Sequence, residues 1–169
     1  MELITNSFVI ADAKKCINCK VCEIACFLVH NKNAPKTVGN LKGPIMPRLF
    51  VTRVGSINMP IQCHQCEDAP CAKVCIVDAI KKQEGKIVIN EQKCIGCKAC
   101  AIVCPFGAIE MSLSYKSVAN KCDLCNGKSK LACVEACPEK ALSQVNLKEL
   151  KKNRNKKALL NLMNMGKEI

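Results

Sequence analysis

Four cysteines lie within a stretch of eleven residues, 94–104, and Pro105 follows the last of them. The chain of 169 residues contains 16 cysteines, and all of them fall into groups of this kind. A disulfide framework joins cysteines that are far apart in the chain, so such dense groups need another explanation. The four groups are Cys16, Cys19, Cys22 and Cys26; Cys63, Cys66, Cys71 and Cys75; Cys94, Cys97, Cys100 and Cys104; and Cys122, Cys125, Cys133 and Cys137.

The spacing in the first and third groups is typical of iron–sulfur ligands. Both groups have gaps of two, two and three residues between successive cysteines. In this pattern three thiolates surround one cubane and the fourth binds a different cluster. A tetrahedral zinc ion is usually bound by two separated Cys-x2-Cys pairs. We therefore expect 4Fe-4S clusters, with the fourth cysteine at the start of a short helix that faces away from the first cluster.

An internal repeat supports this interpretation. Residues 9–16 align without gaps on residues 87–94, and both segments read as a short strand, a polar turn and a first cysteine. An Ala followed by Ile or Leu also recurs four residues after the last cysteine of three groups, where it predicts a returning strand: Ala79 and Ile80, Ala108 and Ile109, Ala141 and Leu142. The predicted unit is strand, cluster loop, short helix and strand, which is the plan of a two-cluster ferredoxin.

The composition is consistent with inorganic groups bound inside the protein. The chain has no Trp, four Phe and one Tyr, so it lacks the large rings that fill most cores. Its formal charge of +12 counts every cysteine as neutral. Four oxidised clusters with their thiolates carry about −2 each, which leaves a net charge of about +4. Because aromatic residues for base stacking are also scarce, we do not expect a nucleic-acid-binding protein.

The first residues and the hydropathy give expectations about location. Residues 1–7 have no basic segment and no twin arginine, and the apolar stretch at residues 8–11 is short. No apolar run approaches the roughly 18 residues that span a bilayer. We therefore expect a cytoplasmic protein, in which thiols stay reduced and are free to bind metals.

Other chemistry-bearing residues have simpler interpretations. His64 lies between two cysteines and is expected to tune a cluster rather than bind it, since 16 thiols already suffice for four clusters. His30 is expected to be a solvated loop residue. Cys71 has no paired base in the sequence, so it is interpreted as a ligand and not as a nucleophile. The glycines form no G-x-G-x-x-G or phosphate loop, and we expect no catalytic residue.

Two segments fall outside the cluster motifs. Residues 27–61 are expected to form a loop with one strand at residues 48–54, and to take part in contacts between subunits. Residues 147–169 lack cysteine, are rich in Lys and Arg, and place Leu159, Leu162 and Met163 at helical spacing. They predict a basic C-terminal helix that is either solvated or docked on a neighbouring subunit, where it could join complexes into larger assemblies.

The motifs resemble those of the four-cluster electron-transfer subunits of molybdenum and tungsten oxidoreductases. The resemblance covers about residues 8–145 and includes all four groups in order, with Gln-Cys-Glu-Asp-Ala-Pro-Cys at residues 65–71 and Lys-Cys-Asp-Leu-Cys at residues 121–125. In size and motif the chain is similar to the small iron–sulfur subunits of formate dehydrogenase, formate hydrogenlyase and hydrogen-dependent carbon dioxide reductase.

This resemblance implies how the cysteines share four 4Fe-4S clusters and how the fold is organised. The implied fold is α+β, with two ferredoxin-like modules, one inserted in the other, and a C-terminal helix. The outer module comprises residues 1–30 and 115–146, a loop and strand insertion comprises 31–62, the inner module comprises 63–114, and the helix comprises 147–169. The implied ligands are Cys16, Cys19, Cys22 and Cys137 for cluster one; Cys26, Cys122, Cys125 and Cys133 for cluster two; Cys63, Cys66, Cys71 and Cys104 for cluster three; and Cys75, Cys94, Cys97 and Cys100 for cluster four.

The same resemblance implies a function, and two alternatives remain open. The chain is expected to be a non-catalytic subunit that relays electrons between a formate dehydrogenase catalytic subunit and a hydrogenase or a second polyferredoxin subunit. The first alternative is the beta subunit of another molybdenum enzyme, such as a respiratory reductase. The second is a four-zinc structural or nucleic-acid-binding module, which a coloured preparation containing acid-labile sulfide would exclude.

Overall fold

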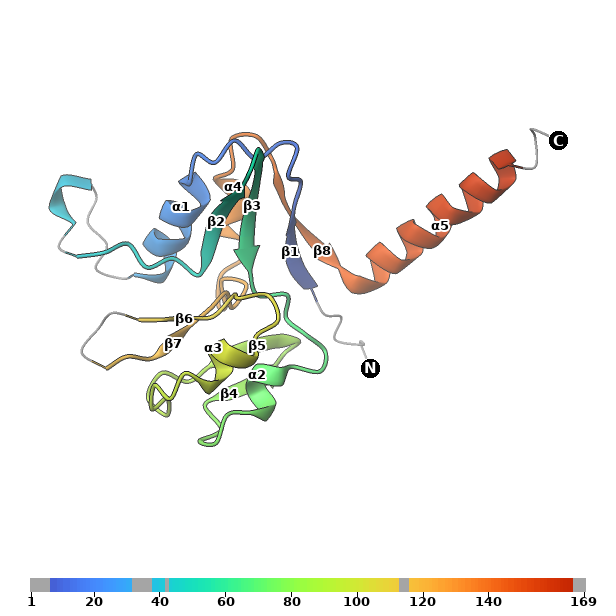
Figure 1. The fold of residues 1–169 in the computed structure, drawn as a ribbon. Helices are drawn as coiled ribbons and strands as arrows, with labels where there is room; N and C mark the ends of the chain where they lie inside the picture. Colours follow the sequence, from blue (N-terminus) through green and yellow to red (C-terminus); the bar gives the residue numbers. More distant parts are fainter. Residues whose placement is uncertain (1–6, 32–37, 42, 113–115, 166–169) are drawn as a thin grey trace.

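The computed structural model describes residues 7–31, 38–41, 43–112 and 116–165. Short strands alternate with short helices in a mixed helix-and-strand fold, and a long helix ends the chain (Figure 1). The elements in chain order are β1 (Ser7–Ala11), α1 (Val21–His30), the 3₁₀ turn η1 (Val38–Asn40), β2 (Leu49–Val54), β3 (Ile57–Gln62), α2 (Pro70–Lys73), β4 (Ile80–Gln83), β5 (Lys86–Ile89), α3 (Ala99–Val103), β6 (Glu110–Met111), β7 (Ala119–Asn120), α4 (Ala132–Glu135), β8 (Leu142–Asn146) and α5 (Leu147–Met165).

The strands of the described residues form four antiparallel pairs. β2 pairs with β3 and β4 pairs with β5, in each case as neighbours in the chain. β6 and β7 form a short third pair. β1 instead pairs with β8 from the far end of the chain, with Ser7 opposite Asn146 and Ala11 opposite Leu142. Two strands that are far apart in sequence are therefore held together, and Figure 1 shows β1 and β8 side by side in the upper part of the molecule, with α2, β4, β5 and α3 below.

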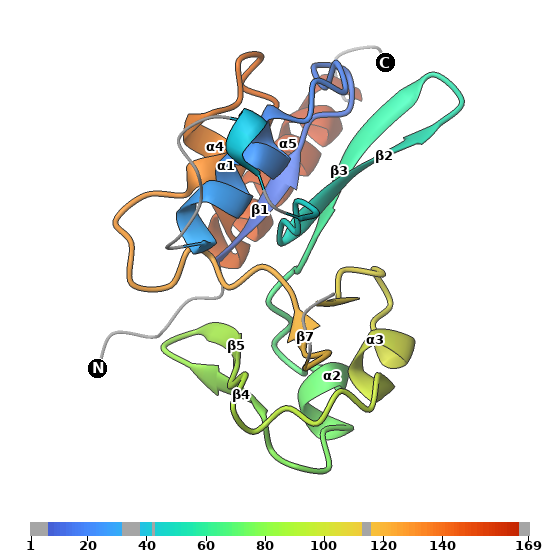
Figure 2. The same ribbon diagram turned by 90° about the vertical axis from the view of Figure 1, so that its left-hand side faces the viewer.

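Buried residues form two hydrophobic clusters, which lie in two parts of the ribbon in Figure 2. The first hydrophobic cluster contains residues of β1, α1, β2, α4 and β8, and the second contains residues of α2, β4, β5 and α3. Cysteines replace the usual large side chains in both: Cys22, Cys26, Cys63, Cys122 and Cys133 in the first, and Cys71, Cys94 and Cys100 in the second. Both cores therefore depend on residues that are candidate metal ligands.

Helices α1 and α3 begin one residue before the third cysteine of their groups. The prediction that the fourth cysteine starts a short helix is therefore wrong. Cys26 lies inside α1, and Cys104 directly follows the last residue of α3. The reason is local, because Lys20 and Lys98 have left-handed φ values of 59° and 66° and turn the chain into the helix before the third cysteine.

The predicted strands are present, and one further strand has no counterpart in the predictions. β4 begins at Ile80 and β8 at Leu142, as the repeat predicts, and β2 occupies most of residues 48–54. The loop expected from residue 27 begins only after α1 ends at His30. β3 was not predicted. Gly55, with a φ of 59°, allows the tight turn that sets Val54 opposite Ile57 and so pairs β3 with β2.

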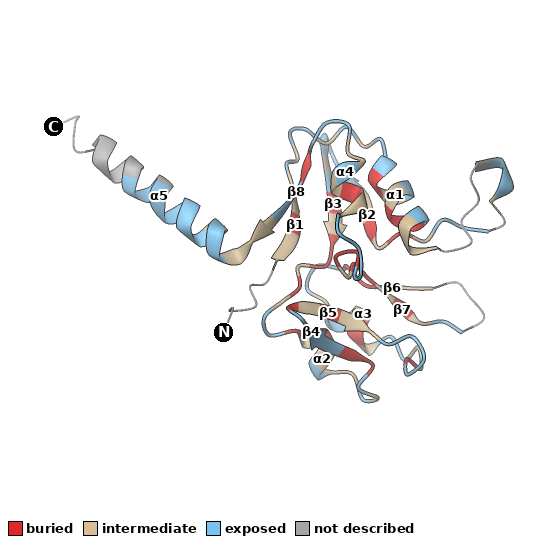
Figure 3. Cartoon of the chain, turned by 180° about the vertical axis from the view of Figure 1, so that it is seen from behind, coloured by how far each residue is buried: buried red, intermediate tan, exposed pale blue. Residues whose placement is uncertain are grey.

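The predicted C-terminal helix is α5, which packs on β8 at its base and then extends away from the rest of the chain (Figures 1 and 3). Its basic residues are exposed as far as residue 156. Leu159 is 60% exposed, and the side chains of Leu162 and Met163 lie outside the described residues, so the predicted apolar edge stays a prediction. Among the described helices, none combines the length and apolar character needed to cross a membrane.

Candidate iron–sulfur sites

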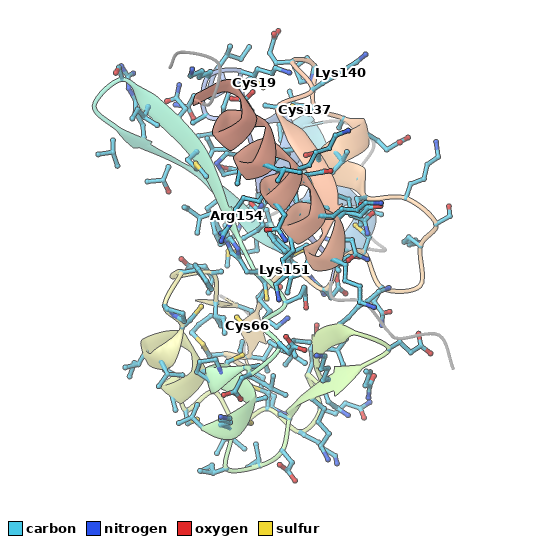
Figure 4. All side chains as sticks on the ribbon, turned by 90° about the vertical axis from the view of Figure 1, so that its right-hand side faces the viewer. Cys19, Cys66, Cys137, Lys140, Lys151 and Arg154 are labelled. Atoms are coloured by element: carbon cyan, nitrogen blue, oxygen red, sulfur yellow. The ribbon has the colours of Figure 1, made fainter. Side chains whose placement is uncertain are left out.

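The cysteines expected for cluster one converge from two distant segments. Cys16, Cys19 and Cys22 come from the loop before α1 and from its first turn, and Cys137 follows α4. All four line one hollow whose empty volume, open solvent included, is about 340 Å³. Figure 4 shows Cys19 and Cys137 at one end of the molecule, in a different part from Cys66.

Two further hollows are each lined by one expected set of thiols. The hollow of about 330 Å³ is lined by the set expected for cluster three: Cys63, Cys66, Cys71 and Cys104. The hollow of about 340 Å³ is lined by the set expected for cluster four: Cys75, Cys94, Cys97 and Cys100. In each hollow three thiols come from one cysteine group and the fourth comes from another group, as in the crossed arrangement that the family resemblance implies.

The cysteines expected for cluster two are the most enclosed set. Burial, followed by the charge of Cys26, raises the pKa of the Cys133 thiol to about 12, and burial also raises the pKa of Cys122. The thiols are therefore near enough to repel one another when ionised. All four are at most 8% exposed: Cys26, Cys122, Cys125 and Cys133.

Burial affects the thiols of the other sets in the same direction. It raises the pKa of Cys22 and that of Cys71, each to about 11. Such thiols are neutral near pH 7, whereas iron binds thiolates, so each thiol must release its proton as the metal binds. A group that brings positive iron to these positions offsets the cost of burying several thiolates together.

Left-handed backbone conformations recur at matching positions in the cysteine loops. Such residues turn successive N–H groups toward one side, which suits a bound anionic group. Two residues after a first cysteine, φ is 61° at Asn18, 50° at Gln65, 72° at Gly96 and 56° at Leu124. Three residues after a last cysteine, φ is 51° at Asp78, 60° at Gly107 and 48° at Lys140. Gly96 has a second requirement, because a Cβ there would lie 2.2 Å from the carbonyl oxygen of Ser117.

Backbone N–H groups donate hydrogen bonds to several of the thiols. Ala79 N–H donates to Cys75 Sγ at 3.2 Å, and Ala141 N–H donates to Cys137 Sγ at 3.3 Å. These are the alanines of the recurring Ala-Ile or Ala-Leu pairs, so the repeat encodes this contact. Hydrogen bonds to ligating sulfurs favour the more negative, reduced state of a cluster. Further N–H donors are Arg48 to Cys26, Gln65 to Cys63, Ala119 to Cys94 and Leu124 to Cys122.

The thiol sets fit a multi-iron group better than single ions. Four Zn–S bonds of about 2.3 Å draw the sulfurs of a tetrahedral site to within about 4 Å of one another. Within the described ranges, no three His, Cys, Asp or Glu side chains are close enough together to hold one metal ion. The thiols instead face shared hollows, as ligands of a cubane must, because its irons lie at separate corners.

Asp123, which lies between two candidate ligands, forms a polar junction with α1. Its carboxylate accepts hydrogen bonds from His30 Nε2 at 3.0 Å and from Arg48 Nη1 at 2.6 Å. Burial opposes ionisation of Asp123, but His30 and Arg48 outweigh it and hold its pKa well below its usual range. Burial likewise opposes protonation of His30, but Asp123 and Cys26 raise its pKa to about 9. The expectation of a solvated loop histidine is therefore wrong.

His64 lies beside the hollow expected to hold cluster three. Its ring stacks on Phe106 with centroids 4.1 Å apart and lies 5.5 Å from the ring of Phe8. Burial lowers the pKa of His64, which favours the neutral imidazole. The side chain lines the same hollow as Cys63 and Cys66, so it is within reach of the thiols. Its predicted tuning role stays a prediction.

Three buried polar side chains near the thiols were not predicted. Gln62, Gln65 and Lys121 are at most 4% exposed. Gln65 donates from Nε2 to the Cys122 carbonyl at 2.9 Å and accepts at Oε1 from the Ile87 N–H at 2.7 Å, so it joins the second cysteine group to β5 and to the fourth group. The repeat carries a signal for the other two, because each directly precedes the first cysteine of its group.

Comparisons with known proteins support the interpretation of these sites. A family model described as a 4Fe-4S dicluster domain matches residues 54–147. The chain is 44% identical over 156 residues to YsaA of Escherichia coli (strain K12), with 88% of this chain and 96% of that protein covered. It is 39% identical over 166 residues to the electron transport protein HydN of the same strain, with 86% of this chain and 91% of that protein covered. It is 38% identical over 174 residues to formate hydrogenlyase subunit 2 of that strain, with 83% of this chain and 82% of that protein covered.

Converging thiols, inward-turned N–H groups and these relatives together define an iron–sulfur protein of the electron-transfer class. The chain belongs to the 4Fe-4S dicluster domain family. Its cofactors are 4Fe-4S clusters, and its role is electron transport. These findings favour iron–sulfur clusters over the four-zinc alternative.

Proposed function

We propose that this chain is a cytoplasmic, non-catalytic relay that passes single electrons between a formate dehydrogenase catalytic subunit and a hydrogenase subunit. The observation that carries the proposal is the convergence of the thiols into sets of four, three around hollows and one fully buried. The relatives named HydN and formate hydrogenlyase subunit 2 support the choice of partners. On the hydrogenase side the partner is either the hydrogenase itself or a second polyferredoxin subunit.

The proposed ligands are the 16 thiols in the four crossed sets given above. A bound 4Fe-4S cluster accepts and releases one electron. The chain holds each cluster through four thiolates, directs N–H groups such as that of Ala79 toward the sulfurs, and limits the access of water by burial. Electron transfer of this kind needs no general acid or base.

The proposed order of the sites follows from shared elements. Cys22 of cluster one and Cys26 of cluster two lie one helical turn apart on α1. The charge of Cys63, of cluster three, adds to the rise in the pKa of Cys122, of cluster two, so these thiols are also near each other. The third cysteine group has the spacing of the first and joins cluster four to cluster three in the same way. The order is therefore one, two, three and four.

The two terminal sites are the most accessible. Cys19 of cluster one and Cys97 of cluster four are exposed, whereas every thiol of cluster two is buried. Large apolar side chains accompany both, since Ile17 is 60% exposed and Ile95 is 57% exposed. In the repeat these isoleucines occupy the same position, directly after the first cysteine. Both ends of the relay therefore offer a similar apolar surface to partner subunits.

The proposed organisation is two ferredoxin-like modules, one inserted in the other. The outer module comprises residues 1–30 and 115–146, and the inner module comprises residues 63–114, with 31–62 as an insertion. The separation of the buried residues into two hydrophobic clusters supports this division. Cys104 packs against both hydrophobic clusters, so a candidate ligand lies at the boundary between them.

The test of the relay is anaerobic isolation of the native chain from its own cells. We expect about 16 irons and a similar amount of acid-labile sulfide per chain, and co-purification of a formate dehydrogenase and a hydrogenase. A colourless, zinc-containing protein would contradict the cofactors. A four-cluster protein that co-purifies with a different molybdenum enzyme would contradict the partners alone.

Helix α5 is the proposed docking segment toward neighbouring subunits. It projects from the body of the chain, and Figure 4 shows Lys151 and Arg154 along its length. Deletion of residues 147–169 should reduce the size of the native complex in anaerobic gel filtration while the iron content per chain is kept. An unchanged size would remove the docking role and leave the relay intact.

A further inference from the structure

Two buried polar side chains occupy equivalent positions in the two halves of the chain. Gln62 directly precedes Cys63 and is 4% exposed, and Lys121 directly precedes Cys122 and is 3% exposed. The second and fourth cysteine groups correspond to each other, since each supplies the first, second and third thiols of one expected set. Gln62 and Lys121 therefore stand at the same point of the repeated unit.

The two side chains also make the same contact. Gln62 Nε2 donates to the Val9 carbonyl at 2.7 Å, and Lys121 Nζ donates to the Ile87 carbonyl. Val9 aligns on Ile87 in the internal repeat, so the acceptors are equivalent as well. Each side chain ties the start of its cysteine group to a strand of the other module, because β1 precedes the first group and β5 precedes the third. The contact is shared, and the charge differs, because one donor is a neutral amide and the other an ammonium.

The polar contacts of Lys121 are those of an ammonium group. Its Nζ also donates to the Cys122 carbonyl at 3.0 Å, so its hydrogen-bond partners are carbonyl oxygens, which accept from an ammonium. Asp123 lies nearby, but Arg48 Nη1 at 2.6 Å and His30 already balance its carboxylate. The Lys121 charge is therefore not neutralised by this carboxylate.

Lys121 lies near thiols expected for cluster three. Burial raises the pKa of Cys66 and Cys71, and the charge of Lys121 counteracts this rise at both. Ile87, whose carbonyl accepts from Lys121, lines the hollow that these thiols surround. The ammonium thus lies behind the wall of this hollow, where water provides little screening.

We propose that Lys121 is a tuning residue that raises the reduction potential of cluster three above that of cluster two. In the internal repeat the neutral Gln62 corresponds to Lys121, and it stands to cluster two as Lys121 stands to cluster three. The inference rests on the proposed function, since it requires the four clusters. An added electron makes a cluster more negative, so a fixed cation behind the hollow favours the reduced form. The two inner sites of a pseudo-symmetric relay then differ in potential, and the electron rests preferentially on the side of the inner module.

The test exchanges the two side chains and measures potentials. Lys121→Gln, Lys121→Arg and Gln62→Lys are purified and reconstituted under nitrogen, and redox titrations are followed by electron paramagnetic resonance. In Lys121→Gln the potential of one cluster should fall, with roughly a tenfold change in its reduction equilibrium, or about 59 mV for one electron. Lys121→Arg should keep the native value. Gln62→Lys should raise the potential of a different cluster, and it sacrifices no hydrogen bond at Oε1, which has no partner among the described residues.

Two controls separate the possible results. Lys128→Gln removes an exposed lysine near the same cysteine group and should leave all potentials unchanged. Cys71→Ser, which alters a ligand expected for cluster three, should change the signal that shifts in Lys121→Gln. Iron and sulfide in every variant show whether four clusters are present.

The measured potentials decide whether Lys121 tunes cluster three. Native potentials in a fully loaded Lys121→Gln variant, or equal shifts in the Gln and Arg variants, would overturn the tuning role and leave the relay intact. If Lys121→Gln does not assemble, Gln62→Lys decides, because unchanged potentials there would also overturn it. A native chain without four clusters would instead refute the proposed function itself.

Discussion

The outer half and the inner half of the chain, meaning the proposed outer and inner modules, repeat one backbone plan and fill it with different side chains. The position after the first cysteine of the second and fourth groups shows this clearly. In the outer half it holds Asp123, which is bonded to His30 and Arg48. In the inner half it holds His64, which stacks on Phe106 and makes a tilted ring contact with Phe8. The backbone loops place the thiols, and the other side chains give each half its own means of stabilisation.

The halves also differ in how their strands meet. β4 and β5 form a hairpin in which Gln83 lies opposite Lys86. β1 and β8 come from opposite ends of the chain, with Ala11 opposite Leu142. Closing so long a segment costs several kcal/mol more in chain entropy than closing a hairpin. On the proposed ligand pairing, the outer half therefore depends more strongly on the thiols whose clusters would link its two distant segments.

Iron removal should have the largest effect, and it should affect the two halves unequally. Anaerobic chelation removes the group that draws Cys137 toward the first cysteine group, so both cores should loosen. Hydrogen exchange followed by mass spectrometry should show loss of protection in β1 and β8 before loss in β4 and β5. Equal or reversed loss of protection would contradict the argument from chain entropy, and retention of the full native protection would contradict a cluster-dependent fold.

Matched ligand substitutions should have the next largest effect. Cys137→Ala and Cys75→Ala each remove a thiol that accepts an N–H bond from the alanine four residues later. Each should lower the iron content by up to about four atoms per chain, with loss or conversion of one cluster. Cys137→Ala should also weaken the pairing of β1 with β8, because on the proposed pairing a cluster joins this thiol to the first cysteine group. Equal stability of the two variants in urea under nitrogen would contradict that difference.

Sequence predicts the parts of this molecule that repeat locally. The first cysteines, the Ala79 and Ala141 positions and the returning strands depend on short spacings, so the pattern in the chain carries their structure. β3 lacks such a signal, because it follows a tight turn at Gly55 and has Pro60 in its interior. The extra strand forms because β2 supplies a complete antiparallel partner.

The side chains whose environment the sequence did not predict correctly, or did not predict at all, depend on partners that are distant in sequence. His30 is ordered by Asp123, which is 93 residues away in sequence, and no local pattern connects them. Lys121 is buried by its contact with Ile87 in β5, 34 residues away. A lysine or histidine in a polar sequence is usually exposed, and only the tertiary structure reverses that expectation. Comparing the two copies of the repeat position by position is the one sequence signal that points to Lys121.

The polar junction of the outer half should contribute less than the ligands. Asp123→Asn removes a carboxylate that accepts from both His30 and Arg48, so we expect a loss of about 2 kcal/mol in the free energy of unfolding. The matched control is Asp68→Asn in the inner half. Asp68 also lies 2.6 Å from its partner, Lys73, but both side chains are largely exposed, and the loss should be at most about 0.5 kcal/mol.

The measurement for this pair is the urea midpoint for loss of cluster absorbance under nitrogen. Asp123→Asn should lower the midpoint and Asp68→Asn should leave it almost unchanged. Equal effects would mean that burial of the Asp123 junction adds nothing to its strength. Because Asp123 lies between Cys122 and Cys125, iron content must be native in both variants for the comparison to hold.

The aromatic stack of the inner half should have the smallest effect. His64→Ala removes contacts to Phe106 and to Phe8 of β1, and aromatic pairs of this kind contribute about 1 kcal/mol. His64→Phe retains a ring and should stay within about 0.5 kcal/mol of the native protein. Since Phe8 belongs to the outer half, the stack also joins the halves. A double-mutant cycle of His64→Ala with Phe8→Ala should therefore give a favourable coupling energy below about 1 kcal/mol, and a coupling of zero would show that the two halves are held together by other contacts.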